Sequence, residues 1–301
     1  MAFTAESLAA HPAFIGVLGH LARGLRSVHD ETPRLARALA SHQRWLLSQA
    51  AFALHFEHDP DDPGSGLTTV RLKEMITGIG GASRNTVLNY LDEMVAYRFA
   101  RYVDVPGRRY RRLEITEKTY AGMMRWFVAN LMALDGLDGG CRAVTMTAHP
   151  HLLRLAQPVA ARACLDDPLW CDPPPRIAAF LWTESGGLVV DELVARTDPE
   201  KERDGRIEIG RIDARRMAEQ LMMSRTHLQR LFKRAELLGC LGWTGPPRAS
   251  AMWFASDFLR EYAGWQAVKF AAVDQAFAKA LATLPVDLAL SPQSDDVLRT
   301  G

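Results

Sequence analysis

An internal repeat with a near-constant offset constrains this chain more than any other feature of its sequence. Four pairs of segments match in the same order, and the members of each pair lie 138 to 142 residues apart. The longest pair is HPAFIGVLGHLAR with HPHLLRLAQPVAAR, and the shortest is the dipeptide Ser-Arg. The pairs begin at His11 and His149, Pro33 and Pro175, Ser83 and Ser224, and Tyr120 and Tyr262. This pattern predicts an internal duplication, and two copies indicate paired domains rather than a solenoid.

The local pattern in each copy is two short helices followed by a hairpin. In the first copy, VRLKEMITGI has amphipathic spacing, and Ser83 can cap a second helix whose apolar stripe contains Val87, Leu91 and Met94. FARYVDV and YRRLEI then flank the turn residues Pro106-Gly107, as strands of a hairpin do. This order is typical of a winged helix-turn-helix. We therefore expect a mainly α fold with small β-hairpin wings (α+β), built from two winged helix-turn-helix domains.

Longer helices are expected around these motifs. Apolar spacing predicts a helix over 8–29 and further helix over 33–56, where Ser41 can cap the second part. The segment HDPDDPGSG (58–66) is predicted to be a loop, and Thr116 is expected to cap the helix that follows it.

Two domains are expected, divided at the glycine-rich joint DGLDGG. Their predicted ranges are 1–140, with a winged-helix core at about 41–134, and 141–290, with a core at about 175–283, followed by a flexible tail at 291–301. Winged-helix regulators usually act as two-fold dimers, and two copies in one chain can form that dimer internally. The helices expected to build this pseudo-dimer core are 8–29, 117–134, 149–165 and 257–283. The alternative is that each half packs alone, as two beads on a linker.

The second helix of each motif is expected to present a polar face to DNA. If Val87 points inward, helical geometry turns Asn85, Asn89 and Asp92 outward, with Thr86 beside them. Amide and guanidinium side chains can form paired hydrogen bonds with base edges in the major groove. A merely solvated helix face is the alternative. The equivalent residues of the second copy are Thr226, Arg230 and Lys233, with His227 and Gln229 beside them.

The first hairpin is rich in arginine, which suits phosphate contact or insertion into a minor groove. Its arginines are Arg101, Arg108, Arg109, Arg111 and Arg112. Pairing with neighbouring acids is the alternative, but Asp104 and Glu114 are too few to neutralise five arginines. The second hairpin keeps only Arg248, while its helix is more basic.

Basic residues gather in both motifs although the net charge is only +1. Residues 205–250 contain nine Lys or Arg against four Asp or Glu, and residues 68–118 contain ten against six. The remainder is consequently acidic, as expected if a DNA-binding surface is confined to the motifs. The predicted DNA contacts are Arg84, Asn85, Thr86, Asn89, Arg101, Arg108, Arg109, Arg111, Arg112, Arg215, Arg225, Thr226, His227, Gln229, Arg230, Lys233 and Arg248.

Other classes of function have little support in the sequence. The N-terminus lacks a signal-peptide pattern and no apolar run reaches the length of a membrane span, so a cytoplasmic, nucleoid-associated protein is expected. There is no Gly-rich phosphate loop, HExxH motif or nucleophile elbow, so neither an enzyme activity nor a cofactor is predicted. The four cysteines form no CxxC pair and are expected to be reduced, packed thiols.

Two features leave alternatives open. The run HFEHDPDD, which contains His55 and His58, suggests either a metal site or an acidic surface loop. The seven tryptophans either line a small-molecule pocket between the dimer core and the DNA-binding parts or belong to the core.

MAEQLMMSRTHLQRLFKRAELLGCL and, more loosely, EMITGIGGASRNTVLNYLDEMVAYRF with DVPGRRYRRLEIT resemble winged-helix regulators of the MarR type. The resemblance covers most of both halves and implies a bacterial transcriptional regulator with double-stranded DNA as its partner, no membrane partner, and room for a small-molecule effector. MarR proteins are normally single-domain homodimers, whereas this chain is expected to be a monomeric pseudo-dimer or to form a further homodimer. Its two unlike reading faces predict a non-palindromic site. The alternatives are a plasmid-type replication initiator with two winged helices and a tandem winged-helix protein-interaction module that does not bind DNA.

Overall fold

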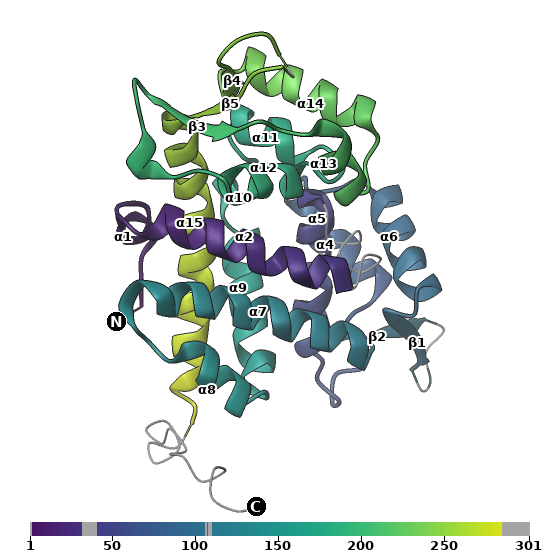
Figure 1. Ribbon diagram of the computed structural model, residues 1–301. Coiled ribbons are helices and arrows are strands. Elements are labelled where there is room, and N and C mark those ends of the chain that lie inside the picture. Colours follow the sequence, from purple (N-terminus) through teal and green to yellow (C-terminus); the bar gives the residue numbers. More distant parts are fainter. Residues whose placement is uncertain (1, 32–40, 106, 108–109, 248, 285–301) are drawn as a thin grey trace, which may run out of the picture.

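The structure, a computed structural model, describes residues 2–31, 41–105, 107, 110–247 and 249–284. These residues form a mainly helical fold with small antiparallel sheets, which confirms the predicted α+β composition (Figure 1). None of the helices in these ranges is both long enough and apolar enough to cross a membrane. The predicted helix start at Pro33 and the predicted tail at 291–301 lie outside the described residues.

The first half begins with helices and ends with a hairpin and a long helix. Its elements are α1 (Ala5–Ala9), α2 (Phe14–Glu31), α4 (His42–Phe56), α5 (Thr69–Gly78), α6 (Arg84–Ala96), β1 (Ala100–Asp104), β2 (Arg111–Ile115) and α7 (Glu117–Asp138). The Ser83 hydroxyl accepts the N–H of Thr86 at 3.2 Å and caps α6, and Ser41 caps α4 in the same way. Strand β1 pairs antiparallel with β2, and Leu67 adds a single bridge to Leu113.

Two local predictions in the first half are wrong. The helix expected over 8–29 is broken, because a capping box at Thr4 starts α1 early and Pro12 follows it before α2 begins. Thr116 does precede α7, but its hydroxyl bonds to the carbonyls of Arg98 and Phe99 at 3.1 and 3.3 Å instead of capping the helix.

The second half repeats the order of the first with extra short elements. They are α8 (Arg142–Ala148), α9 (Leu152–Leu165), α10 (Pro168–Cys171), α11 (Pro175–Leu181), α12 (Gly186–Val194), η1 (Pro199–Lys201), β3 (Arg206–Gly210), α13 (Ala214–Gln220), α14 (Arg225–Leu237), β4 (Leu241–Trp243), β5 (Met252–Ala255) and α15 (Ser256–Leu281). Ser224 caps α14 through the N–H of His227 at 3.1 Å, as Ser83 caps α6. In the sheet, β5 lies between β3 and β4.

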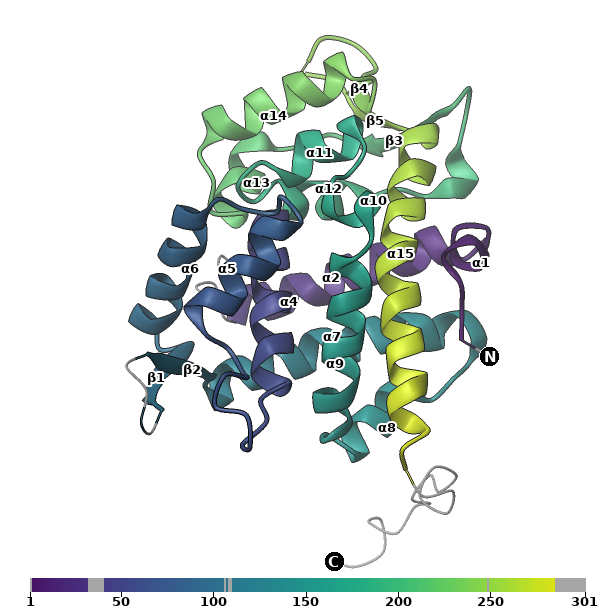
Figure 2. The same cartoon turned by 180° about the vertical axis from the view of Figure 1, so that it is seen from behind.

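The two halves pack against each other in reciprocal pairs. Helix α1 packs on α15, and α8, which has the matching place in the second half, packs on α7. Likewise α9 packs on α4, and α2 packs on α12. Figure 2 shows α9 and α15 side by side on one side of the molecule, and Figure 1 shows α2 and α7 side by side on the other. The arrangement is therefore not two beads on a linker, because one buried apolar cluster extends through both halves.

An ion-pair network fixes the joint between the halves. Arg142 lies 3.1 Å from Asp135, 2.7 Å from Asp138 and 2.7 Å from Asp274. Asp274 also accepts the backbone N–H of Phe3 at 2.8 Å. The hydrogen bond with Arg142 is the main cause that lowers the pKa of Asp138. The network ties the N-terminal segment, the joint and the last helix together.

Tryptophans surround the buried His42 in the core. Trp170 and Trp265 stack with ring centroids 4.0 Å apart, and each centroid lies within 5.5 Å of the imidazole centroid. Burial lowers the pKa of His42 to about 4, so the neutral ring donates from Nε2 to the Trp170 carbonyl at 2.7 Å. These tryptophans belong to the core, whereas Trp182 is exposed.

The thiols are only partly as predicted. All four cysteines are free, and the pKa values of three are raised by burial. Cys141 is the exception, because it precedes α8 at the joint and is exposed rather than packed.

Candidate nucleic-acid interface

Helix α6 exposes the polar face that its sequence predicts. Val87 and Leu91 are buried, whereas Arg84, Asn85 and Asn89 are exposed. Within the described part of the chain, neither asparagine amide has a hydrogen-bond partner, so both are available to a ligand. Thr86 is half-buried beside them, and its hydroxyl bonds to the capping serine at 2.9 Å.

Glu114 holds two arginines of the first wing. Its carboxylate oxygens lie 2.9 Å from Arg101 and 3.0 Å from Arg112. The hydrogen bond from Arg101 is the main cause that lowers the pKa of Glu114, and the hydrogen bond from Arg112 lowers it further, so Glu114 is ionised. The prediction that Arg112 contacts DNA is corrected here, because its side chain is only 17% exposed and also donates to His58. Arg112 faces the interior of the protein.

Arg111 lies on the other face of the wing and remains exposed. Its guanidinium sits 4.2 Å from the centroid of the Tyr102 ring, a cation–π contact that orients it along the sheet. Arg108, Arg109 and Arg248 lie outside the described residues. The described part of the first wing therefore offers Arg111 and, with its charge partly neutralised, Arg101.

Helix α14 exposes a basic face without acidic partners. Leu228 and Leu231 are buried, while Arg225, Arg230 and Lys233 are exposed. Among the residues that the structure describes, no ion pair joins these three cations to an acid. The predicted neighbours on this face are Thr226, which is exposed, and His227 and Gln229, which are half-buried.

A groove of about 380 Å³ runs beside α14. Its apolar lining includes Ile212, Phe232 and Trp243, and its polar lining comprises Thr226, Gln229, Arg230, Lys233 and Glu236. Arg215 does not contribute to this lining, and its guanidinium forms an exposed ion pair with Glu219 at 3.0 Å. The groove thus brings four of the predicted contacts together and leaves Arg215 aside.

Both polar helices lie at the outside of the molecule. Figure 2 shows α6 beside α5 at one edge and α14 above α13 at the adjoining edge. The strands of their hairpins lie at the same two edges (Figure 1), so α6 and α14 belong to separate parts of the molecular surface.

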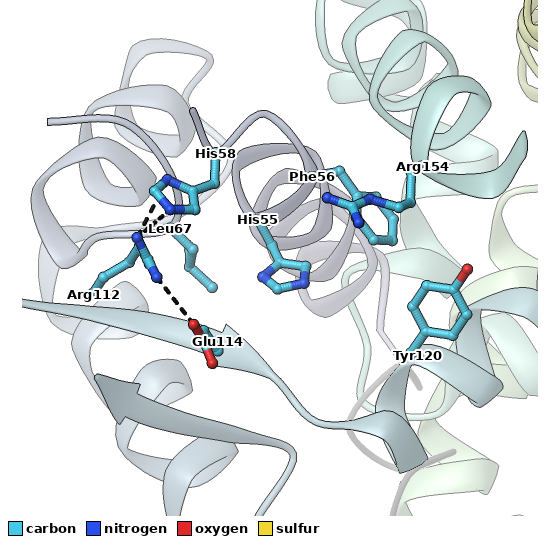
Figure 3. A pocket seen from close by; sticks show the side chains of 8 residues that line it. All are labelled: His55, Phe56, His58, Leu67, Arg112, Glu114, Tyr120 and Arg154. Atoms are coloured by element: carbon cyan, nitrogen blue, oxygen red, sulfur yellow. Dashed lines mark hydrogen bonds and ion pairs between the residues drawn. The ribbon is translucent and has the colours of Figure 1, made fainter. Parts of the chain in front are cut away.

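A cavity of about 300 Å³ lies behind the first wing (Figure 3). It is lined by His55, Phe56, His58, Leu67, Arg112, Glu114, Tyr120 and Arg154. Arg154 comes from α9 in the second half, and the other seven residues come from the first. Two arginines face one carboxylate, so the cavity has a net positive lining.

Burial controls protonation in this cavity. It lowers the pKa of His55 to about 4 and, with the neighbouring Arg112 as the second cause, lowers that of His58. A neutral His58 accepts from Arg112, as Figure 3 shows. Tyr120 donates its hydroxyl to the Pro150 carbonyl at 3.1 Å. Arg154 is exposed and has no ion pair with a described residue.

Sequence reasoning missed this cavity because its walls come from separate parts of the chain. Arg112 and His58 are 54 residues apart, and Arg154 belongs to the other copy. The available signals were the HFEHDPDD run, which contains His55 and His58, and the match between Tyr120 and Tyr262. Tyr262 is fully buried and donates to Asp191 at 2.6 Å, whereas Tyr120 lines open space.

The HFEHDPDD run begins in the last turn of α4, and from Glu57 onward it forms a loop organised by Ser65. Its hydroxyl lies 2.9 Å from His58 Nδ1 and accepts the N–H of Asp59 at 2.8 Å. In the described ranges, no group of three or more His, Cys, Asp or Glu is placed to hold a metal ion.

Comparisons with protein-family models, with curated proteins and with solved structures find no match for this chain.

Proposed function

We propose that this chain is a sequence-specific regulator of transcription that binds double-stranded DNA through two non-identical winged helix-turn-helix units. The observation that carries the proposal is the exposed face of α14, where Arg225, Arg230 and Lys233 have no acidic partner among the described residues. Such a face attracts a polyanion, and the groove beside it adds hydrogen-bonding groups of the kind that contact bases.

The order of elements supports assigning a winged helix-turn-helix to each half. In the second half, β3 precedes α13 and α14 and pairs with the hairpin strand β5. In the first half, Leu67 precedes α5 and α6 and bridges to the hairpin strand β2 at Leu113. In both halves, the segment before the two helices thus pairs with the second strand of the hairpin, through a strand in the second half and through a single bridge in the first. A serine caps the second helix in each half, α6 and α14.

Reciprocal packing supports a pseudo-two-fold dimer within one chain. If each helix is replaced by its counterpart in the other half, the contact of α1 with α15 becomes the contact of α8 with α7. In the same way, the contact of α4 with α9 becomes the contact of α12 with α2. We assign the units to 1–140 and 141–290, and a cytoplasmic regulator of the MarR type is the protein class we propose. Helices α6 and α14 would enter successive major grooves, about one DNA turn apart.

Binding to duplex DNA at two salt concentrations tests the proposal. Phosphate contacts make affinity fall steeply with salt, so a fluorescently labelled genomic duplex is expected to dissociate as salt rises. Arg230→Ala is expected to weaken binding by about tenfold, in line with about 1–3 kcal/mol for a base contact. Lys201→Ala is the control, because Lys201 is equally exposed but lies on η1 and pairs with Asp198 at 3.0 Å.

The same experiment separates the rival functions. An interaction module without DNA affinity would show no salt-dependent binding. A replication initiator would protect iterated direct repeats in a footprint, whereas a regulator of the proposed kind protects two half-sites one turn apart.

We also propose that a small-molecule effector occupies the cavity behind the first wing. The cavity joins β2 to α7 and to α9 of the other half, so a ligand there contacts both the wing and the pseudo-dimer core. Its net positive lining favours an anion, and Phe56 and Leu67 favour an apolar body.

A further inference from the structure

We propose that the two halves of the chain recognise chemically different half-sites: α6 an A·T base pair through an asparagine amide, and α14 a G·C base pair through an arginine. The inference rests on the proposed DNA-binding function and specifies the ligand of that same surface.

The comparison of matching positions carries the argument. With Ser83 aligned to Ser224, Asn89 corresponds to Arg230, and Asp92 corresponds to Lys233. Each pair is exposed in both helices. Arg84 and Arg225 also correspond and are both exposed, so they cannot distinguish the halves. Asn85 and Thr226 also correspond, are both exposed and differ, so the difference in recognition comes from this pair and from the two pairs further along each helix.

Arg230 presents donors only. A guanidinium offers parallel N–H groups, and guanine offers two acceptors, N7 and O6, on its major-groove edge. Adenine places an amino group where O6 would be, so the second bond is lost. Arg230 is exposed, lines the groove with Gln229, and has no acid partner within the described residues. Lys233, one turn further, supplies a point charge for a neighbouring phosphate.

Asn89 presents one donor and one acceptor. A carboxamide therefore matches adenine, whose major-groove edge offers the N7 acceptor and the N6 amino donor. Asn85 repeats the same chemistry one turn earlier, and both amides are exposed. Asp92 can only accept hydrogen bonds, so it repels phosphates and the acceptor edge of guanine at this end of the helix.

The first wing agrees with an A·T half-site on separate grounds. Arg111 is exposed beside Tyr102 on the face of the hairpin away from Glu114. Arginine inserted into a minor groove favours A·T-rich DNA, where that groove is narrow and its potential most negative. Helix and wing of the first unit thus favour the same base composition.

Selection of duplexes from a random pool by the full-length chain is the first test. The expected product is an asymmetric site, with a guanine in one half and an A·T-rich other half about one turn away. The guanine is then replaced by 7-deazaguanine, which pairs normally but lacks the N7 acceptor. Wild-type affinity is expected to fall about tenfold, whereas affinity of Arg230→Gln is expected to change less than twofold. Replacing adenine by 7-deazaadenine in the other half-site should likewise lower the affinity of the wild-type protein, whereas the affinity of Asn89→Ala should change little.

The outcomes separate this inference from the function on which it rests. Salt-dependent binding to a site with two like half-sites overturns the inference and leaves DNA binding intact. So does equal sensitivity of wild type and Arg230→Gln to 7-deazaguanine. If no duplex is bound even at low salt, the proposed function itself fails. A gain of function gives the sharpest support: Arg230→Asn is expected to change the preferred base of that half-site from guanine to adenine.

Discussion

Arg142 donates from Nε to the buried carboxylate of Asp274 at 2.7 Å and so links the first helix of the second half to the last helix of the chain. The Asp274 side chain is 2% exposed, and its other oxygen accepts from the backbone of Phe3. A single carboxylate thus joins three segments that are distant in sequence.

Removing this guanidinium is expected to destabilise the fold. Arg142→Ala should lower the free energy of unfolding by about 3 kcal/mol, because it leaves the buried carboxylate of Asp274 with one remaining hydrogen-bond donor. Urea unfolding measured by circular dichroism gives the value. Arg215→Ala is the matched control, since its ion pair with Glu219 is exposed, is screened by solvent and should contribute far less to stability. Equal losses in the two variants would contradict the proposed role of the network.

Stability is expected to fall as the pH is lowered from about 6.5 to about 4. The pKa of His42 is lowered by burial to about 4, so between these values only the unfolded chain binds the proton. Above pH 6.5 His42 is neutral in both the folded and the unfolded chain, so its contribution to the free energy of unfolding does not change with pH. Below about pH 4 the loss of free energy of unfolding, on the order of 3 kcal/mol, is complete. Urea unfolding at several pH values measures it. His42→Phe should show a shallower pH dependence, with the remainder from His55; an unchanged slope argues against His42.

Two glycine substitutions should have opposite effects. A Cβ at Gly186 would overlap the backbone carbonyl of Phe180, which cannot move without disturbing α11, so Gly186→Ala should cost at least about 2 kcal/mol. A Cβ at Gly264, inside α15, meets no atom within 4 Å. Gly264→Ala should therefore raise stability by about 0.5–1 kcal/mol. Melting temperatures of both variants check the pair, and destabilisation by Gly264→Ala would show that α15 is packed more tightly there.

Two cations on α14 should differ in their effect on DNA binding. Lys233→Ala is expected to weaken binding to all sequences alike and to reduce the slope of log affinity against log salt by about 1, because it removes a phosphate contact. Arg230→Ala should instead lower the preference for the selected site over unrelated DNA. Anisotropy titrations with specific and scrambled duplexes at several salt concentrations measure both effects. If the two variants have the same effects on the salt dependence of binding and on the preference for the selected site, Lys233 and Arg230 do not have separate roles.

Occupation of the cavity behind the first wing can be probed with simple anions. Benzoate is expected to raise the melting temperature more than acetate, since the cavity combines Arg154 with the apolar Phe56 and Leu67. Arg154→Gln should remove the increase without changing the melting temperature of the free protein. If neither anion raises the melting temperature, or if both anions raise that of Arg154→Gln as much as that of the wild-type protein, the cavity is not an anion site.

Local features of the fold could be predicted from the sequence because they depend on neighbouring residues. Ser83 caps its helix as predicted, and the spacing of Val87 and Leu91 correctly identifies the buried side of α6. The hairpin strands follow from alternation around a turn, and the register of β1 with β2 places Arg101 opposite Glu114. Each of these features is decided within a few residues of the chain.

Features that depend on distant segments were beyond prediction. Arg112 was expected on the DNA side, but a histidine 54 residues away and a carboxylate on its own strand hold it inward. The broken helix at the N-terminus reflects a capping box at Thr4, which competes with an apolar periodicity that continues through it. The helices predicted over 8–29, 117–134, 149–165 and 257–283 do pack together, since α2 contacts α7 and α15 contacts α9, α7 and α2. The packing of α4 on α9 and of α12 on α2 was not predicted.

The bond between Phe3 and Asp274 spans 271 residues, and it has a consequence for synthesis of the protein. At typical ribosomal rates, the partner of α1 emerges on the order of tens of seconds after α1 itself. During that time the apolar face of α1, with Leu8 at its centre, has no α15 to cover it. The nascent chain therefore keeps this apolar face uncovered until α15 leaves the ribosome.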